Sequence, residues 1–144
     1  MKKRLFGLAL VLALCLALLS VSALAADEPY NLWVNNIQVT DANANDVLGG
    51  ADEGATVSYD AATNTLTLNG ATLSGSHDAG YFKANIYAIN DLNIELEGSN
   101  SIGSGGDCAI LAESDLKIRG SGSLACGSKD AAFEGHGIYC RGNL

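Results

Sequence analysis

A repeat in the second half of the chain constrains the fold more than any other feature. Three segments align residue by residue, 86–92 (IYAINDL), 110–116 (ILAESDL) and 138–144 (IYCRGNL), at spacings of 24 and 28 residues. Glycine, serine and asparagine are frequent between them. A unit of this length, with short strands and glycine-rich corners, is typical of one coil of a parallel β-helix. A leucine-rich repeat has a similar period but needs a Leu/Asn consensus that this chain lacks.

Stacking in this register predicts which side chains share a face. Alternate positions of each strand should point inward and form ladders from coil to coil. The expected ladders are Ile86, Ile110 and Ile138, then Ala88, Ala112 and Cys140, then Leu92, Leu116 and Leu144. Residues 66–70 are expected to be an earlier copy, with Leu66 standing 26 residues before Leu92. Cys140 would then replace a buried alanine as a small core residue.

The first half of the chain predicts hairpins. Residues 32–34 and 37–39 flank Asn35-Asn36, a pair that tolerates the left-handed conformations of a two-residue turn. Residues 56–59 and 65–68 alternate with period two around a polar turn. Because no window has a helical stripe, we expect an all-β protein. The predicted architecture is a right-handed parallel β-helix of few coils, with an N-terminal β-hairpin cap and first coil in residues 26–82 and the repeats in 83–144.

The chain begins with a pattern typical of a secretory signal peptide. Basic residues at 2–4 precede an apolar run from Leu5 through Leu19, and alanines stand at positions 23 and 25. This pattern predicts cleavage after residue 25, with Ala26 as the mature N-terminus. Two alternatives are an uncleaved anchor helix, for which the run is short, and lipidation at Cys15, where the preceding Leu14 replaces a required small residue. We expect a secreted protein, extracellular or at the cell surface.

The charge and the cysteine content limit the kinds of partner that we expect. Without residues 1–25 the chain has five basic and sixteen acidic residues, a net charge of −11. Such a surface repels nucleic acid and anionic lipid, so neither nucleic acid nor, after cleavage, a membrane is an expected partner. Cys108, Cys126 and Cys140 remain, and at most two of them can pair within the chain. The third is either a buried, inert thiol or has a partner outside this chain.

Several segments resemble a known family. Residues 30–34 (YNLWV), 38–40 (QVT), 45–49 (NDVLG) and 57–68 lead into units of the form Ile-Tyr-x-x-x-Asp-Leu-x-Ile. Together they resemble the secreted carbohydrate-binding parallel β-helix family of Gram-positive anaerobes. The resemblance covers most of residues 30–144 and implies a pectate-lyase-like shape, calcium, and binding of plant polysaccharides such as cellulose or pectate. The chain departs from the family in having about three coils, and the resemblance does not place the calcium ligands.

Tyr87 and Tyr139 are the candidate carbohydrate-binding residues. The inward ladders leave Tyr87 pointing outward, and Tyr139 takes the same place two coils later, with Leu111 between them. Coils stack at about 4.8 Å, so the rings would stand about 10 Å apart and could lie against two consecutive sugars. The alternative is that the rings cover the side of the coils or pack under a loop. Trp33 is expected in a hydrophobic cap over the first coil.

Asp91 and Asp115 are the candidate calcium ligands. They stack one coil apart, and calcium prefers carboxylate oxygens. With Lys117 and Arg119 downstream, they are also the residue types that a calcium-dependent polysaccharide lyase needs to abstract a proton beside a sugar carboxylate. However, an Asp or Asn precedes the ladder leucine in every copy, Asn143 included, which favours a turn capped by its own side chain. We therefore expect no catalytic residue.

Two further patterns are expected to be structural. Residues 41–52 imitate an EF-hand calcium loop, but Asp46 stands where that loop needs glycine and Asp52 where it needs glutamate. The segment is therefore predicted to be a turn rich in Asn and Asp. His77 and His136 lie in Gly/Ser-rich corners with no matched Ser, Cys or Asp, and are expected to be solvated loop residues.

These observations favour a secreted, non-catalytic polysaccharide-binding β-helix module. The alternative is a structural or adhesive surface stalk that binds protein partners, and the third possibility is the lyase. The chain stops at Leu144, halfway through a coil. We therefore expect that these residues are the front end of a longer chain, and that an open C-terminal edge would self-associate.

Overall fold

The chain forms strands throughout the part that the structure describes. The computed structural model describes residues 27–50, 56–103, 105–127 and 136–144, so the expected signal peptide at 1–25 lies outside it. The strands are β1 (Pro29–Val34), β2 (Ile37–Thr40), β3 (Thr56–Asp60), β4 (Thr65–Asn69), β5 (Thr72–Leu73), β6 (His77–Asp78), β7 (Lys83–Ala88), β8 (Leu92–Glu97), β9 (Ser99–Ile102), β10 (Cys108–Ala112), β11 (Leu116–Gly120), β12 (Ser123–Cys126) and β13 (His136–Cys140). The described residues contain no helix, and so none that could cross a membrane. The prediction of an all-β fold is confirmed.

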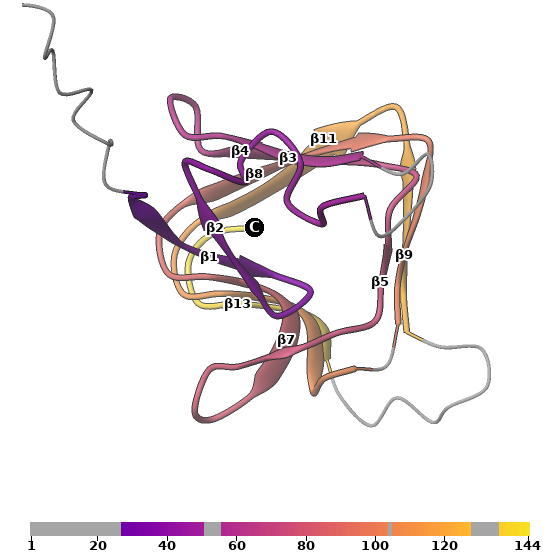
Figure 1. Ribbon diagram of the computed structural model, residues 1–144. Coiled ribbons are helices and arrows are strands. Elements are labelled where there is room, and N and C mark those ends of the chain that lie inside the picture. The colour runs from indigo at the N-terminus through magenta and orange to yellow at the C-terminus, as the bar shows by residue number, and fades with distance from the viewer. Residues whose placement is uncertain (1–26, 51–55, 104, 128–135) are drawn as a thin grey trace, which may run out of the picture.

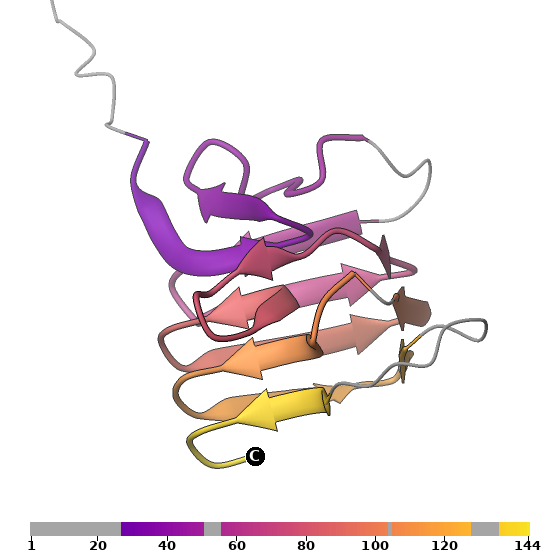
Figure 2. The same ribbon diagram turned by 90° about the horizontal axis from the view of Figure 1, so that it is seen from below.

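The strands form three sheets, which lie along three sides of a stack seen end-on (Figure 1). The first sheet has the order β13-β10-β7-β1-β2, with β6 beside β7; the second is β11-β8-β4-β3 and the third β12-β9-β5. We call β4-β5-β7 the first layer, β8-β9-β10 the second and β11-β12-β13 the third; the layers lie one beneath another (Figure 2). Strands of successive layers pair in parallel, whereas β1, β2, β3 and β6 pair antiparallel.

The register between layers matches the repeat. Ile110 lies opposite both Ile86 and Ile138, and Leu116 lies opposite Leu92. Paired residues of the second and third layers are a constant number of positions apart in the sequence as far as β12, where Cys126 lies opposite Ile102. The longer spacing of the last repeat therefore arises in the connection between Cys126 and His136. The first-sheet and second-sheet ladders in the repeats are therefore confirmed.

Two ladder positions differ from the prediction. Leu66 lies opposite Ile94, so the first layer is shifted by two residues from the expected pairing with Leu92. Because side chains alternate along a strand, a shift of two keeps Leu66 on the inward face, where it is fully buried. Leu144 follows Asn143, whose carbonyl accepts from Leu116 N as the Asp115 carbonyl does from Leu92 N, but its side chain is 78% exposed and is not buried as the third ladder predicts.

The core fills the space between the three sheets. Its fully buried large side chains are Leu66, Leu68, Leu73, Ile86, Ile94, Ile102, Ile110 and Leu116, together with Val34, Val39 and Val57 from the N-terminal strands. Burial of each such side chain stabilises the fold by roughly 2 kcal/mol relative to its exposure. Cys140 is partly buried against this core, as expected at an alanine position. Cys126 and Cys140 are thiols and are not joined by a disulfide.

One buried amide ties the three layers together. Asn100, in β9, is 3% exposed. Its Oδ1 accepts a hydrogen bond from the backbone N–H of Ala71 in the first layer at 2.9 Å. Its Nδ2 donates to the carbonyl of Glu97 at 3.0 Å and to that of Ser123 in the third layer at 3.1 Å. Because all three bonds go to backbone groups, the side chain supplies hydrogen bonds that the ladders leave unmade at this corner.

The N-terminal end of the stack is covered by the hairpin of β1 and β2 and by the loop after it. The hairpin turns at Asn35 and Asn36, whose φ values of 54° and 68° are the left-handed values that a two-residue turn needs. The loop then runs along the outer edge of β3, where Val47 N donates to the Val57 carbonyl at 2.8 Å. The predicted hairpin is confirmed.

The outer edge of β2 is closed by a side chain. Asn43 Oδ1 accepts from Thr40 N at 2.8 Å, and its Nδ2 donates to the Gln38 carbonyl at 2.9 Å. The amide thereby replaces a neighbouring strand at an edge that would otherwise be open to pairing. Asp46 Oδ1 accepts from a backbone N–H of the same loop at 3.2 Å. The EF-hand-like segment is thus the predicted turn rich in Asn and Asp, and Asp52 lies outside the described residues.

Candidate functional site

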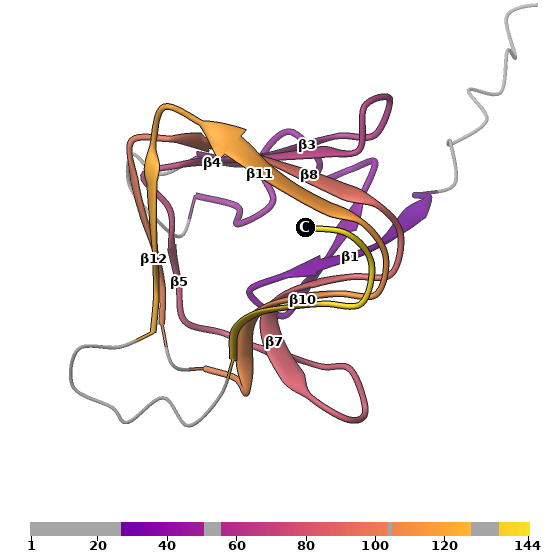
Figure 3. The ribbon, with the colours of Figure 1, turned by 180° about the vertical axis from the view of Figure 1, so that it is seen from behind.

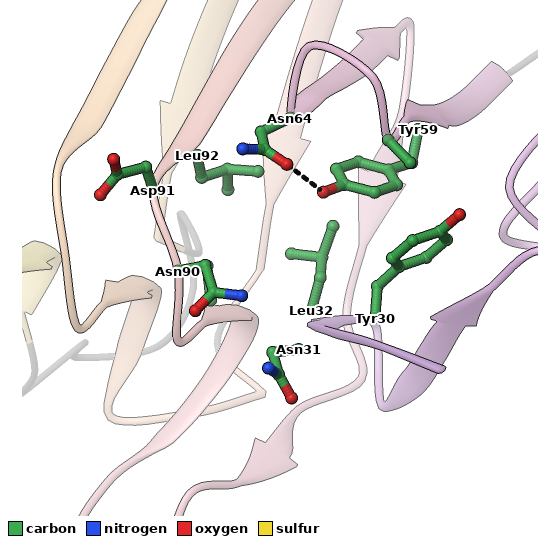
Figure 4. Close-up of a pocket in the computed structure, with 10 residues that line it drawn as sticks. Tyr30, Asn31, Leu32, Tyr59, Asn64, Asn90, Asp91 and Leu92 are labelled. Atoms are coloured by element: carbon green, nitrogen blue, oxygen red, sulfur yellow. Dashed lines mark hydrogen bonds between the residues drawn. The ribbon is translucent and has the colours of Figure 1, made fainter. Parts of the chain in front are cut away.

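A pocket opens where the N-terminal strands meet the connection between β7 and β8 (Figure 4). Its volume is about 80 Å³. It is lined by Tyr30, Asn31, Leu32, Tyr59, Ala61, Asn64, Ala88, Asn90, Asp91 and Leu92. Three side-chain amides and two phenol groups supply its uncharged polar groups, and the carboxylate of Asp91 is its one charged group.

Two tyrosines stand on one side of this pocket, and Asn90 and Asp91 stand on the other (Figure 4). The ring centroids of Tyr30 and Tyr59 are 5.1 Å apart, with the ring planes at 60°. Each tyrosine lies two residues along its strand from a buried residue, Leu32 for Tyr30 and Val57 for Tyr59. Side chains two apart share a face of a strand, so both rings lie on the inward face at an end of the strand where they are only partly buried.

Hydrogen bonds fix both phenol groups. Tyr59 Oη donates to Asn64 Oδ1 at 3.1 Å, and Tyr30 Oη donates to Asp41. The hydrogen bond to the Asp41 carboxylate raises the pKa of Tyr30 to about 12, and burial raises the pKa of Tyr59. Both rings are therefore neutral at ordinary pH. Since their O–H donors are already used, the phenol oxygens are left to accept bonds from hydroxyl groups of a ligand.

A second pocket adjoins the first along the stack. Its volume is about 180 Å³, and its lining is Asn64, Asp91, Leu92, Asn93, Asp115 and Lys117. Three of these residues also line the first pocket, so the two form one continuous surface, which we call the groove. The groove runs from the N-terminal strands past the second layer to the start of the third.

Asp91 and Asp115 join successive layers. Asp91 Oδ1 accepts from Ser114 Oγ and from Asp115 N, the latter at 3.2 Å. Asp115 Oδ1 accepts from Asn143 N at 2.8 Å and from Asn143 Nδ2 at 3.0 Å. These two bonds, the backbone one first, lower the pKa of Asp115. The carboxylates thus cap the turn of the next layer, as the recurrence of Asp or Asn before the ladder leucine indicated.

Calcium binding by Asp91 and Asp115 stays a prediction. Among the described residues, no three His, Cys, Asp or Glu side chains gather as a metal site. Each aspartate already accepts two hydrogen bonds through Oδ1, and the two carboxylates together offer at most four oxygens, fewer than the six to eight oxygen ligands of calcium. The residues present therefore do not fit a complete calcium site.

Comparisons with known proteins assign no family. No family model, curated protein or solved structure matches this chain. The groove must therefore be interpreted from its own chemistry.

Tyr87 and Tyr139 lie where the sequence predicts, on the outer face of the first sheet with Leu111 between them in register. Leu111 is 1% exposed and belongs to a small buried cluster against which both rings pack. Phe82, in the turn between β6 and β7, meets Tyr139 at a centroid distance of 5.6 Å. Burial also raises the pKa of the Tyr87 phenol. Both tyrosines belong to a small apolar cluster on the outside of the stack, and their binding of carbohydrate stays a prediction.

Trp33 and His77 differ from the sequence-based expectations. Trp33 lies directly opposite Tyr87 on the outer face of the first sheet, not within a hydrophobic cap. His77 stacks on both rings, with centroid distances of 4.6 Å to Trp33 and 5.6 Å to Tyr87. It is therefore not a solvated loop residue. The hairpin that carries it projects from the corner beside β7 (Figure 3), and for His136 the described residues give only its place at the start of β13.

The groove contains one of the two basic residues that the lyase hypothesis singled out. Lys117 lines its second pocket. Arg119 Nε instead donates to Glu95 Oε2 at 2.7 Å, on the exposed face of β8 and β11. Sequence reasoning found Asp91, Asp115 and Lys117, but it missed Tyr30, Tyr59 and Asn64. These three belong to the part of the chain that the repeat does not cover.

Proposed function

We propose that this protein is a secreted, non-catalytic polysaccharide-binding module built as a right-handed parallel β-helix. Each layer would be one coil, and the in-register parallel pairing in all three sheets supports this architecture. The leader at 1–25 supports secretion, and the resemblance to the carbohydrate-binding β-helix family agrees with both. Fractionation of the producing cells, with N-terminal sequencing of the protein in the medium, tests secretion; a mature chain that begins elsewhere than Ala26 contradicts the predicted cleavage.

The observation that carries the proposal is the combination of ring faces and amides in the groove. Sugar sites place an aromatic face against the apolar face of a pyranose ring and surround it with a few polar side chains. Tyr30 and Tyr59 supply the rings, while Asn64 and Asn90 supply amide donors and acceptors. The groove lies on the surface along the stack, so it can accept a chain rather than only a single sugar.

Retention on insoluble cellulose and on immobilised polygalacturonate, with and without chelator, tests this function. We expect retention of the purified protein on at least one of the two polymers. The chelator arm decides whether calcium contributes. Lack of retention on every polysaccharide by a folded protein would refute the proposal and favour the surface stalk, and release of unsaturated uronides would show a lyase.

Paired variants locate the binding surface. The double variant Tyr30→Ala/Tyr59→Ala should lose about 2 kcal/mol of binding free energy, or roughly 30-fold in affinity, since each aromatic contact is worth about 1 kcal/mol. The matched variant Tyr87→Ala/Tyr139→Ala makes the same chemical change on the outer face. If the first double variant binds normally and the second loses binding, the carbohydrate site is at Tyr87 and Tyr139 instead of the groove. Thermal unfolding followed by circular dichroism separates loss of binding from loss of fold.

A further inference from the structure

The charge of the groove bears on which polysaccharide it accepts. Asp91 lines both of its pockets, so any ligand that extends from one pocket into the other passes this carboxylate. Asp115 stands one layer further along the second pocket. Lys117 offsets one of the two negative charges, which leaves a net negative groove on a chain whose net charge without residues 1–25 is −11.

We infer that Asp91 and Asp115 make the groove selective for neutral polysaccharides and exclude polyuronates. This inference rests on the proposed function and names the substrate class within it. A polyuronate carries a carboxylate on every sugar, and a like charge placed beside these aspartates is repelled. A neutral glycan instead offers hydroxyl donors, which both carboxylates can accept.

The hydrogen bonds within the stack keep these two charges in place. Asn143 donates twice to Asp115 Oδ1, and Asp115 N donates to Asp91 Oδ1. The carboxylates cannot turn away from the groove without breaking the caps between layers, so an approaching uronate meets fixed charges.

The experiment compares two ligands of equal length, cellohexaose and hexagalacturonic acid, by titration calorimetry of the purified protein in chelator and about 20 mM salt. We expect cellohexaose to bind at least tenfold more tightly. The double variant Asp91→Asn/Asp115→Asn keeps both Oδ1 acceptors but removes both charges. It should narrow the difference about tenfold, at about threefold for each exposed charge, through tighter binding of hexagalacturonic acid. Salt at about 0.5 M should reduce the difference in affinity between the two hexamers for the wild type, because the charges are then screened.

A matched control removes two aspartate charges elsewhere. Asp107 also caps a neighbouring layer, since its Oδ2 accepts from Lys83 N at 2.8 Å, and Asp78 caps its own turn through Gly80 N at 2.9 Å. The variant Asp78→Asn/Asp107→Asn should keep the full preference for cellohexaose.

The outcomes separate the two proposals. If hexagalacturonic acid binds as tightly as cellohexaose, or if the control double variant narrows the preference as much as the groove double variant does, the inference is overturned while polysaccharide binding stands. If neither hexamer binds and neither polymer retains the protein, the proposed function itself has failed.

Discussion

Replacement of Asn100 by alanine should destabilise the fold more than the loss of any exposed amide. Three hydrogen bonds disappear, to Ala71 N, the Glu97 carbonyl and the Ser123 carbonyl, and these buried backbone groups are left without a side-chain partner. At about 1 kcal/mol for each bond, the free energy of unfolding should fall by about 3 kcal/mol. For a domain of this size that lowers the melting temperature by roughly 10 °C. Thermal and urea unfolding monitored by circular dichroism measure the change.

A matched variant and a charge change sharpen this prediction. Asn93 also bridges two layers, but it makes one exposed bond, from Nδ2 to the Thr63 carbonyl at 2.8 Å, so Asn93→Ala should cost below about 1 kcal/mol. Asn100→Asp keeps the acceptor for Ala71 N but points a carboxylate at two carbonyl oxygens. The pKa of this new carboxyl should therefore be raised in the fold, and the stability of the variant should increase as the pH falls toward about 4. Equal losses for Asn100→Ala and Asn93→Ala would refute the reasoning.

Three further predictions concern titration and packing. Tyr30 should ionise near pH 12 in a spectroscopic titration, because its proton is held by Asp41. Its contribution to stability is therefore present below pH 10 and is lost as the pH rises through 12. Ionisation of Tyr30 at the ordinary tyrosine pKa would contradict the hydrogen bond. The pKa of Asp115 is lowered in the fold, so its contribution to stability is present above the ordinary value near 3.8 and is lost below it. The variant Asp115→Asn should therefore lose less stability than the wild type as the pH falls through this range. Equal losses of stability in the two proteins would show that this cap does not contribute. Leu111→Ala, in the apolar cluster outside the stack, should lower the free energy of unfolding by about 2–3 kcal/mol in urea, since the side chain is 1% exposed; a loss below about 1 kcal/mol would mean that this cluster is not packed.

The repeat made the parallel sheets predictable. Each aligned segment carries the same small and large residues at the same places, so the inward faces and the register between Ile86 and Ile110 follow from spacing alone. The turn at Asn35 and Asn36 was predictable for a different reason, because few residue pairs tolerate left-handed backbone at two successive positions. Both signals are local or periodic, which is the information that a single sequence contains.

The groove and the outer cluster depend on contacts that no period encodes. Tyr30 and Tyr59 lie in different antiparallel pairs, and they meet only because both pairs end at the same side of the stack. Glycine and serine around His77 favour a loop, but the chain folds back there through a strand of two residues. That short pairing brings the imidazole onto Trp33 and Tyr87, a tertiary contact that local propensity could not indicate.

The length differences between layers have a consequence for how such a stack can diversify. Between the third sheet and the first, the chain connects Leu73 to Ala84, Ile102 to Cys108 and Cys126 to His136, and these residues occupy equivalent places in the ladders. The connections differ in length, yet the strands on either side stay in register. Closure of a longer connection costs little, about 0.6 kcal/mol for each doubling of its length. The connection at this corner can therefore gain or lose residues while the paired strands on either side keep their register.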